Sequence, residues 1–506
     1  MGDRLNMIES LQNLMAGFAA AMTLGNLLFA FAGCMLGTLI GLLPGLGPAA
    51  GTAILIPLTF SLDPTGAIIM LCAIYYGAMY GGTITSVLIN VPGEAASVVT
   101  CIDGYQMALQ GRAGSALAIA AIGSFIGGVL ATVALVFVAV PLAQLALKFG
   151  PAEFFALMLA GLCLVVGLAG RNILAALLMT ALGLLLAMIG IDPVRGAPRF
   201  TFGVQELFDG IGFVPVVMGL FGVGELLLAA ESRQTKMIQV DLKKWNPTPE
   251  EWRHSAGAIG RGTVIGFILG LIPGVGAIVP TFMAYVIEKR VSKTPERFGK
   301  GAIEGVASAE TANNAYANAS MVPLLALGVP SSPTIAVLMG AFIVNGITPG
   351  PFLFTERPEL VWTVIASFFI GNVILLILNL PLVGLWARLL KIPFSYMCAG
   401  VLIFCVIGAY GLKQSLFDVW VMLGFGVLGY LLRKLEFPVA PAILALILGP
   451  MMEKSLRTTL EISGGSFAIF LDRPFALALL AIPVIVVGAV VLRPRAFANL
   501  RQTDIE

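Results

Sequence analysis

Apolar stretches of about 20 residues recur along this chain, and they limit its fold more than any other feature. A helix of that length crosses the hydrocarbon core of a lipid bilayer. The 506 residues are 58% hydrophobic and 11% charged, whereas soluble globular proteins carry about 25% charged residues. We see no short segments of alternating apolar and polar residues, the pattern typical of a transmembrane β-barrel. The sequence therefore predicts an all-α polytopic membrane protein with about 10 to 12 transmembrane helices.

Basic residues gather in a few polar interruptions between the apolar stretches. The clearest are the linker 231–256, the stretch 288–300 and the C-terminal end of the chain. Under the positive-inside rule we expect all three on the cytoplasmic side of the membrane. His254, in the linker, is expected to be a solvated loop residue. The net charge of +2 does not indicate a nucleic-acid partner.

One segment between two of these basic interruptions is too short to cross the membrane twice. Residues 262–287 read GTVIGFILGLIPGVGAIVPTFMAYVI, and both of their flanks are expected on the same side. The segment therefore has to enter the membrane and return. Its 26 residues are too few for two crossings of about 20 residues each. We predict a re-entrant helical hairpin with the PGVG sequence at its tip.

The same Gly/Pro pattern occurs earlier in the chain. Residues 37–47, GTLIGLLPGLG, align without gaps to residues 266–276, GFILGLIPGVG, with six identities in eleven positions. A second pair follows in the same order, because LINVPGEAAS at 88–97 matches LALGVPSSPT at 325–334 around a Val-Pro dipeptide. The chain therefore reads as an internal repeat with two Gly/Pro hairpins.

The two halves are expected to have opposite orientations. The first hairpin motif, 37–60, is followed by SLDPTG, which contains no lysine or arginine, whereas a basic stretch follows the second. We therefore predict an inverted repeat, with a first half at 1–230, the cytoplasmic linker 231–256, and a second half at 257–506 that contains the hairpin motif 262–287.

Glycine and proline at membrane depth indicate a binding site. Irregular backbone is tolerated there only beside protein or a water-filled cavity, and it leaves helix ends with unpaired groups. N–H groups at helix N-termini bind anions, and exposed carbonyls coordinate cations such as Na⁺. Close helix packing would also use glycine, but two copies in register favour a site. The predicted tip residues are Pro44, Gly45, Gly47, Pro273, Gly274 and Gly276.

Polar residues cluster around the second motif of each half. An ionisable residue within a span is costly and indicates function, whereas asparagine and serine could also serve only in hydrogen bonds between helices. The site residues predicted from these clusters are Thr83, Ser86, Asn90, Pro92, Gly93, Glu310, Asn313, Asn314, Asn318, Pro330, Ser331 and Ser332. No arginine lies in the core of either motif. This is consistent with a site that needs few fixed cations because coupling ions supply positive charge.

Four segments carry a resemblance to a known family. They are GLLPGLGP at 41–48, YYGAMYGGTITSVLINVPGEAASVVTCIDGYQMA at 75–108, GLIPGVG at 270–276, and AETANNA at 309–315 together with LGVPSSPT at 327–334. In these segments the chain resembles the large membrane subunit of the tripartite tricarboxylate transporters. The resemblance covers nearly the whole chain.

The resemblance implies a secondary transporter in a bacterial inner membrane that imports di- or tricarboxylates or related organic anions. It implies two partners besides the lipid bilayer, a periplasmic solute-binding protein and a small membrane subunit of about four spans. It also implies coupling to a Na⁺ or H⁺ gradient, without a cofactor. Elevator-like alternating access is an expectation by analogy with other two-hairpin carriers.

Other functions stay open at this point. Re-entrant hairpins also build the selectivity filters of ion channels, and a carboxylate/cation antiporter would need no binding protein. An intramembrane enzyme is disfavoured because we find no nucleophile–base set, no HExxH and no GxSxG. A structural scaffold would not need two matched broken-helix motifs.

Overall fold

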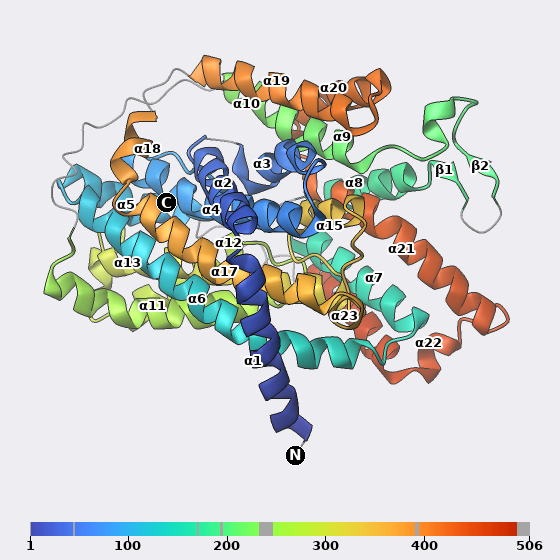
Figure 1. Ribbon diagram of the computed structural model, residues 1–506, viewed down its shortest axis with the longest axis horizontal. Coiled ribbons are helices and arrows are strands. Elements are labelled where there is room, and N and C mark those ends of the chain that lie inside the picture. The colour runs from blue at the N-terminus through green and yellow to red at the C-terminus, as the bar shows by residue number, and fades with distance from the viewer. Residues whose placement is uncertain are drawn as a thin grey trace.

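The computed structural model describes residues 2–43, 46–168, 172–192, 196–231, 246–389 and 394–492. Nearly all of this part of the chain is helical (Figure 1). The described strands are β1 (Gly190–Ile191) and β2 (Pro198–Arg199), which form a short antiparallel ribbon. The predicted all-α class is confirmed.

The helices that precede the linker vary widely in length, from short 3₁₀ turns to one helix of 34 residues. They are α1 (Gly2–Ala21), α2 (Leu24–Gly41), α3 (Gly47–Leu55), η1 (Ile56–Thr59), α4 (Pro64–Ile89), η2 (Ala95–Ser97), α5 (Val98–Leu109), α6 (Ala113–Ala146), α7 (Pro151–Leu168), α8 (Ile173–Ala187), η3 (Gln205–Leu207), α9 (Phe213–Val217), the π-helical η4 (Met218–Val223) and α10 (Gly224–Glu231).

α11 begins at Pro249, within the stretch 231–256 that is predicted as a linker, and the helices from there on begin with a similar order of a long helix, a break and a shorter helix. They are α11 (Pro249–Gly270), α12 (Ile278–Val291), η5 (Pro295–Arg297), α13 (Ile303–Ala319), α14 (Met321–Leu327), α15 (Pro333–Val344), α16 (Leu353–Glu356), α17 (Pro358–Asn379), α18 (Val383–Leu389), α19 (Phe394–Lys413), α20 (Leu416–Lys434), α21 (Ala440–Ile462), α22 (Ile469–Asp472) and α23 (Pro474–Leu492).

Six described helical stretches are long and apolar enough to cross a membrane, which confirms a polytopic protein. Six further apolar helices have 10–17 residues. The predicted total of about 10 to 12 spans depends on how many of these shorter helices also cross, and it stays a prediction. The six long stretches are Leu24–Gly41, Pro64–Ile89, Ala113–Ala146, Phe213–Glu231, Pro358–Asn379 and Leu416–Lys434.

The chain turns back on itself at both Gly/Pro motifs. In the second motif, Arg261 of α11 and Glu288 of α12 form a two-pronged ion pair with N···O distances of 2.8 and 2.7 Å, so the two helices lie side by side on either side of the tip. In the first motif, Gly51 of α3 packs directly on the side chain of Ile40 near the end of α2. Both motifs are therefore helix–break–helix hairpins.

Each hairpin packs its first helix against the next long helix through a row of glycines. An added Cβ at Gly33 would lie 2.5 Å from the carbonyl oxygen of Met70 on α4, and one at Gly262 would lie 2.6 Å from that of Ser308 on α13. Glycine is required because backbone meets backbone there. The remaining members of the two rows approach the same helices in the same register: Gly37, Gly41, Gly266 and Gly270. This shared packing supports the predicted internal repeat.

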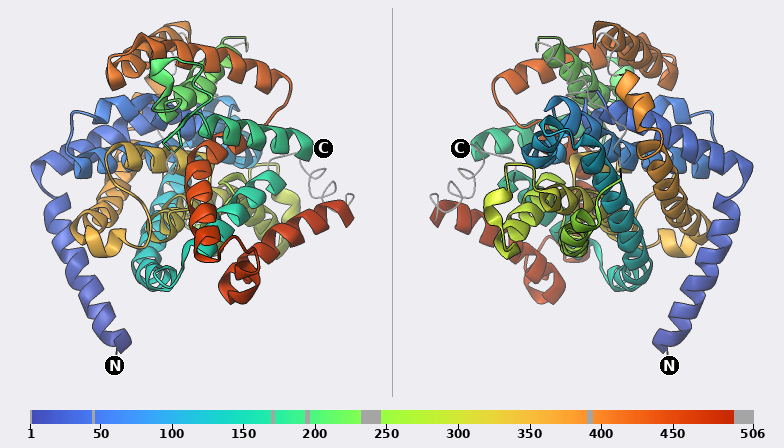
Figure 2. Two further views of the ribbon diagram at one scale, coloured as in Figure 1. Left: turned by 90° about the vertical axis from the view of Figure 1, so that its right-hand side faces the viewer. Right: turned by 90° about the vertical axis from the view of Figure 1, so that its left-hand side faces the viewer.

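The centre of the molecule is formed by α4 and α13, with α6 lying across α13 (Figure 1). α4 is apolar, and it is buried from Gly66 to its end. α13 is buried along its whole length although it carries carboxylates and several asparagines. The first helix, α1, extends away from the body with the N-terminus at its far end (Figure 2). Buried polar groups need partners, so the polar residues of α13 point to the functional site.

Candidate functional site

Both hairpin tips and both Val-Pro loops line one cavity of about 710 Å³, which we call the central cavity. These four segments are far apart in the sequence and come from both predicted halves. The predicted site residues that line it are Gly47, Pro92, Gly93, Gly274, Gly276 and Ser332. Volumes of about 300–1,000 Å³ are typical of sites for small molecules.

The Val-Pro loops begin at two equivalent left-handed turns. Asn90 ends α4 with φ of 56°, and Gly328 ends α14 with φ of 69°. Only glycine, and to a lesser degree asparagine, adopts this conformation readily at the end of a helix. Asn90 is exposed and is not among the residues that line the central cavity. Its place in the structure is that of a helix cap.

Each hairpin tip contacts the Val-Pro loop of its own half. The N–H of Gly274 donates a hydrogen bond of 2.9 Å to the carbonyl oxygen of Ser331. In the first half, the carbonyl oxygen of Gly41 lies so close to Gly93 that a Cβ could not be added there. These contacts hold the two motifs of each half together beside the cavity.

Three helix N-termini converge on the central cavity. The first residues of α3, α12 and α15 all line it. The first turns of α3 and α12 have no side-chain cap, whereas Ser332 caps α15 by accepting a 3.2 Å hydrogen bond from the N–H of Ile335. Unpaired N–H groups and the positive ends of the helix dipoles favour an anion in this position.

The cavity lining contains three charged side chains, those of Glu94, Glu225 and Arg433. Arg433 Nη1 lies 2.5 Å from Glu225 Oε1, and its guanidinium stacks over the ring of Phe221 at 5.6 Å from the centroid. Among the described residues the lining therefore includes one fixed cation, in line with the expectation that few are needed. The two motifs do not reveal this cation, because Arg433 lies far from both of them in the sequence.

Glu94 is buried beside the cavity and bonds to the polar face of α13. Its Oε1 accepts a 2.7 Å hydrogen bond from Asn313 Nδ2. Its backbone forms a capping box with Ser97, whose hydroxyl donates to the carbonyl oxygen of Glu94 at 2.8 Å. Ser86 donates hydrogen bonds to the carbonyl oxygens of Gly82 and Ser97 and so fixes the same loop against α4.

A second carboxylate, Glu310, is buried one turn away on α13. It accepts a 2.6 Å hydrogen bond from the Thr83 hydroxyl and another from the Thr100 hydroxyl. The network extends along α13 through Ser124 of α6, which accepts a 2.7 Å hydrogen bond from Asn314 Nδ2. In the described part of the chain, no ion pair joins Glu94 or Glu310 to a basic residue. A buried carboxylate without a cation beside it is strongly unfavourable. Each of the two groups therefore has to be either protonated and neutral, or ionised with a cation bound to it.

Two buried amide oxygens beside these carboxylates, Asn313 Oδ1 and Asn314 Oδ1, have no hydrogen-bond partner among the described residues. The buried hydroxyl oxygen of Ser331, beside the second hairpin tip, has none either. Amide and hydroxyl oxygens of this kind are suitable ligands for a hard cation. In the described residues, no group of three or more His, Cys, Asp or Glu side chains could hold a metal ion.

Most of the predicted site residues lie either at the central cavity or in the hydrogen-bond network around Glu94 and Glu310. Those not already placed at the cavity or in the polar network are Pro273, which is half-buried at the second tip, and Pro330, which is buried in its loop. Asn318 is buried further along α13, where its Oδ1 accepts a 3.2 Å hydrogen bond from Thr132. Pro44 and Gly45 lie outside the described residues.

Glu225 and Arg433 are the two lining residues with charge that the motifs do not reveal. Both lie in apolar helical stretches that could cross the membrane. An ionisable residue in such a stretch is itself a signal of function, and this signal was available in the sequence. What the sequence does not reveal is that the two residues pair, because 207 positions separate them along the chain.

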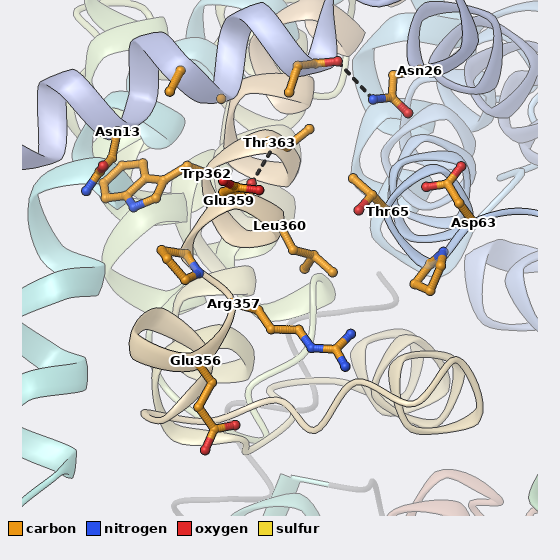
Figure 3. Close-up of a pocket in the computed structure, with 15 residues that line it drawn as sticks. Asn13, Asn26, Asp63, Thr65, Glu356, Arg357, Glu359, Leu360, Trp362 and Thr363 are labelled. Carbon is orange, nitrogen blue, oxygen red and sulfur yellow. Dashed lines mark hydrogen bonds between the residues drawn. The ribbon is translucent and has the colours of Figure 1, made fainter.

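A second cavity, of about 1080 Å³, lies between α1 and the starts of α4 and α17. Figure 3 shows Asp63 and Thr65 on one side and Arg357 and Glu359 on the other. Its lining carries three acidic residues and one basic residue, with Glu356 as the third acid. None of the predicted site residues lines this second cavity.

Comparison with known proteins gives consistent matches over most of the chain. Residues 27–444 match the Tripartite tricarboxylate transporter TctA family. An Agrobacterium vitis protein, described as an uncharacterized 52.8 kDa protein in the TAR-I ttuC' 3' region, is 47% identical over 478 residues, which are 94% of this chain and 95% of that protein. An uncharacterized protein in the TAR-II ttuC' 3' region of the same organism is 46% identical over 222 residues, 44% of this chain and 92% of that protein. No solved structure matches.

Proposed function

Because this chain belongs to the tripartite tricarboxylate transporter TctA family, we propose that it is the large membrane subunit of a secondary transporter that imports di- or tricarboxylates or related organic anions. The proposal places the substrate in the central cavity. A periplasmic solute-binding protein would deliver it, and a small membrane subunit of about four spans would complete the complex in a bacterial inner membrane. The linker 231–256 and the C-terminus would be cytoplasmic.

The observation that carries the proposal is the convergence of three helix N-termini on one cavity. The starts of α3, α12 and α15 supply N–H groups and positive dipole ends, and Arg433 supplies a full positive charge. Carboxylates are among the anions that bind to N–H groups and guanidinium groups of this kind. Because helix ends at membrane depth must face protein or water, a cavity at this position also explains the paired Gly/Pro breaks.

The charges of the site favour coupling to a cation gradient. The lining contains two carboxylates and one guanidinium, so a substrate with two or three negative charges would enter a cavity that is already net negative when all groups are ionised. Cations have to accompany it, because unpaired charge in a medium of low dielectric constant is strongly unfavourable. We assign the accompanying H⁺ or Na⁺ to Glu94 and Glu310, whose surroundings contain partnerless oxygens.

The repeated packing suggests how the site is exposed to each side in turn. Each hairpin rests on a long central helix through a row of glycines, and each tip touches its Val-Pro loop. We propose that both hairpins are re-entrant and belong to inverted halves. Movement of the tips and loops as one unit would then carry the substrate across the membrane, as in an elevator.

Uptake into proteoliposomes tests this function. The purified chain is reconstituted with its small membrane partner, and the binding protein is supplied outside. Radiolabelled succinate, malate, citrate and benzoate are offered under an imposed Na⁺ or H⁺ gradient. We expect saturable, gradient-driven accumulation of at least one carboxylate. Passive flux that neither saturates nor depends on the binding protein would instead indicate a channel, and would refute the proposal.

Variants of the two buried carboxylates test the coupling. Glu94→Gln and Glu310→Gln preserve shape and hydrogen bonding but cannot take up a proton or hold a cation in the same way. Both should lose gradient-driven accumulation and retain exchange of substrate between two equally loaded sides. The matched control is Glu250→Gln, because the Glu250 side chain is 86% exposed at the start of α11. Accumulation at the wild-type level in both buried variants would remove the carboxylates from the coupling step.

A further inference from the structure

We propose that Arg433 binds a carboxylate group of the substrate. In the absence of substrate Glu225 forms an ion pair with the guanidinium of Arg433, and the substrate carboxylate replaces Glu225 when it binds. This inference rests on the proposed function, which places an organic anion in the central cavity. It adds the residue that recognises the anion and the residue that competes with it.

The position of the pair supports this role. Arg433 belongs to the last turn of α20 and Glu225 to the first turn of α10, and both side chains line the central cavity beside the hairpin tips. The Arg433 side chain is 21% exposed and that of Glu225 is 15% exposed. A purely interfacial arginine would extend to water, as Lys434 next to it does with 46% exposure.

The Arg433 guanidinium has an N–H donor that makes no hydrogen bond with the described residues. Its contact with Glu225 is made through Nη1, while its Nε is buried and has no hydrogen-bond partner among the described residues. A buried donor without a partner is unfavourable, so the site is prepared for a further acceptor. An arginine fork binds a carboxylate through two parallel N–H···O bonds, and this geometry would use the free donors.

Close helix packing holds the pair in place. Gly219 of η4 packs against the backbone of α20 near Met422, and Gly429 of α20 packs against the backbone of Leu220. The π-helical turn η4 directly precedes Glu225, and turns of this kind occur frequently at functional sites. The ring of Phe221, under the guanidinium, also lines the cavity. Arg433 is therefore fixed with its charge at the cavity wall.

The replacement of Glu225 by a substrate carboxylate explains why an ion pair between Glu225 and Arg433 is present at the cavity wall. A buried arginine without an anion would be strongly destabilising, so Glu225 compensates its charge when the cavity is empty. A substrate carboxylate offers equivalent hydrogen bonds, so that Arg433 is never left without a partner, and the displaced Glu225 takes up a proton and becomes neutral. Competition with Glu225 also weakens substrate binding enough to allow release. The arrangement selects carboxylates and disfavours neutral ligands, which could not replace Glu225.

Four variants test the inference in the reconstituted complex, with initial rates of succinate and citrate uptake measured over a range of concentrations. Arg433→Gln should raise KM about 10- to 100-fold, the loss expected for hydrogen bonds to a charged group. Arg433→Lys keeps the charge without the fork and should give an intermediate KM. Glu225→Gln should lower KM, because the competing carboxylate is gone, and should also lower kcat, because release is slower. Arg433→Gln with Glu225→Gln removes both charges, so it should fold and should still have a raised KM.

The neighbouring pair of Lys434 and Glu231 provides the matched control. These side chains form an exposed ion pair of 2.9 Å one position further along α20 and do not line the central cavity. Lys434→Gln should leave KM unchanged. A wild-type KM in the double variant would show that the buried pair is structural and would overturn the inference while carboxylate uptake stands. Absence of uptake by the wild-type complex would overturn the proposed function and this inference with it.

Discussion

Replacing Gly262 by alanine should force α11 and α13 apart, whereas the same replacement two residues earlier should not. An added Cβ at Gly262 would lie 2.6 Å from the carbonyl oxygen of Ser308 and 3.3 Å from Thr311 Cβ. Gly260 lies on the exposed face of α11, and nothing lies within 4 Å of its added Cβ. The two variants therefore share the chemistry of the substitution and differ in the helix packing.

The magnitude follows from two opposing terms. Alanine is better than glycine in a helix interior by about 1 kcal/mol, and this gain applies to both positions. At Gly262 the helices have to separate by about 1 Å to restore an ordinary van der Waals distance. Overpacking of this kind costs about 1–3 kcal/mol, and a backbone carbonyl cannot rotate away as a flexible side chain can. Gly262→Ala should therefore be less stable than Gly260→Ala by about 1–3 kcal/mol.

Thermal unfolding in detergent measures this difference. The apparent Tm of Gly262→Ala should lie a few degrees below that of Gly260→Ala, which should equal or exceed the wild-type value. The first half offers the same comparison, with Gly33→Ala on the packed face of α2 and Gly25→Ala in its open first turn. Equal Tm values for Gly262→Ala and Gly260→Ala would refute the conclusion that the glycine row sets the helix distance.

Two further predictions concern residues that fix loops. Asn90→Ala should keep carboxylate uptake and lower the free energy of unfolding by about 1 kcal/mol, because alanine adopts the left-handed conformation less readily. Asn90→Gly should recover the lost stability in the same Tm assay. Loss of uptake in Asn90→Gly would instead show that the Asn90 amide is a ligand. Asp103 accepts three hydrogen bonds from backbone N–H groups of the loop 299–302 and one from the Tyr285 hydroxyl. Asp103→Ala should therefore lower the free energy of unfolding by about 3 kcal/mol or more, and Tyr285→Phe by about 1 kcal/mol. Similar Tm values for these two variants would contradict this difference.

Much of the fold and part of the site follow from local sequence patterns. Apolar runs of helix length predict a polytopic helical membrane protein, because a bilayer admits few other structures. The Gly/Pro breaks at 44–47 and 273–276 predict hairpin tips, and the structure places Gly47, Gly274 and Gly276 at one cavity. Glu310 stands out because it belongs to a cluster of polar residues at 308–320, between apolar stretches of the chain.

Other features depend on contacts that local patterns do not contain. Asn90 lies on the same predicted helix face as Thr83 and Ser86, yet it caps the end of α4, because where a helix ends depends on backbone conformation as well as on periodicity. The number of membrane crossings also does not follow from local patterns, because several apolar helices have 10–17 residues, fewer than a bilayer crossing requires.

The membrane class, the paired Gly/Pro motifs and the family can be predicted without the structure, because they depend on composition and on short spacings. Only the tertiary structure brought both tips, both Val-Pro loops and the ion pair of Glu225 and Arg433 to one cavity. The physical reason is that a charge becomes functional through what surrounds it. Whether an arginine at the end of an apolar helix meets water, lipid or a buried carboxylate is decided by how α10 and α20 pack.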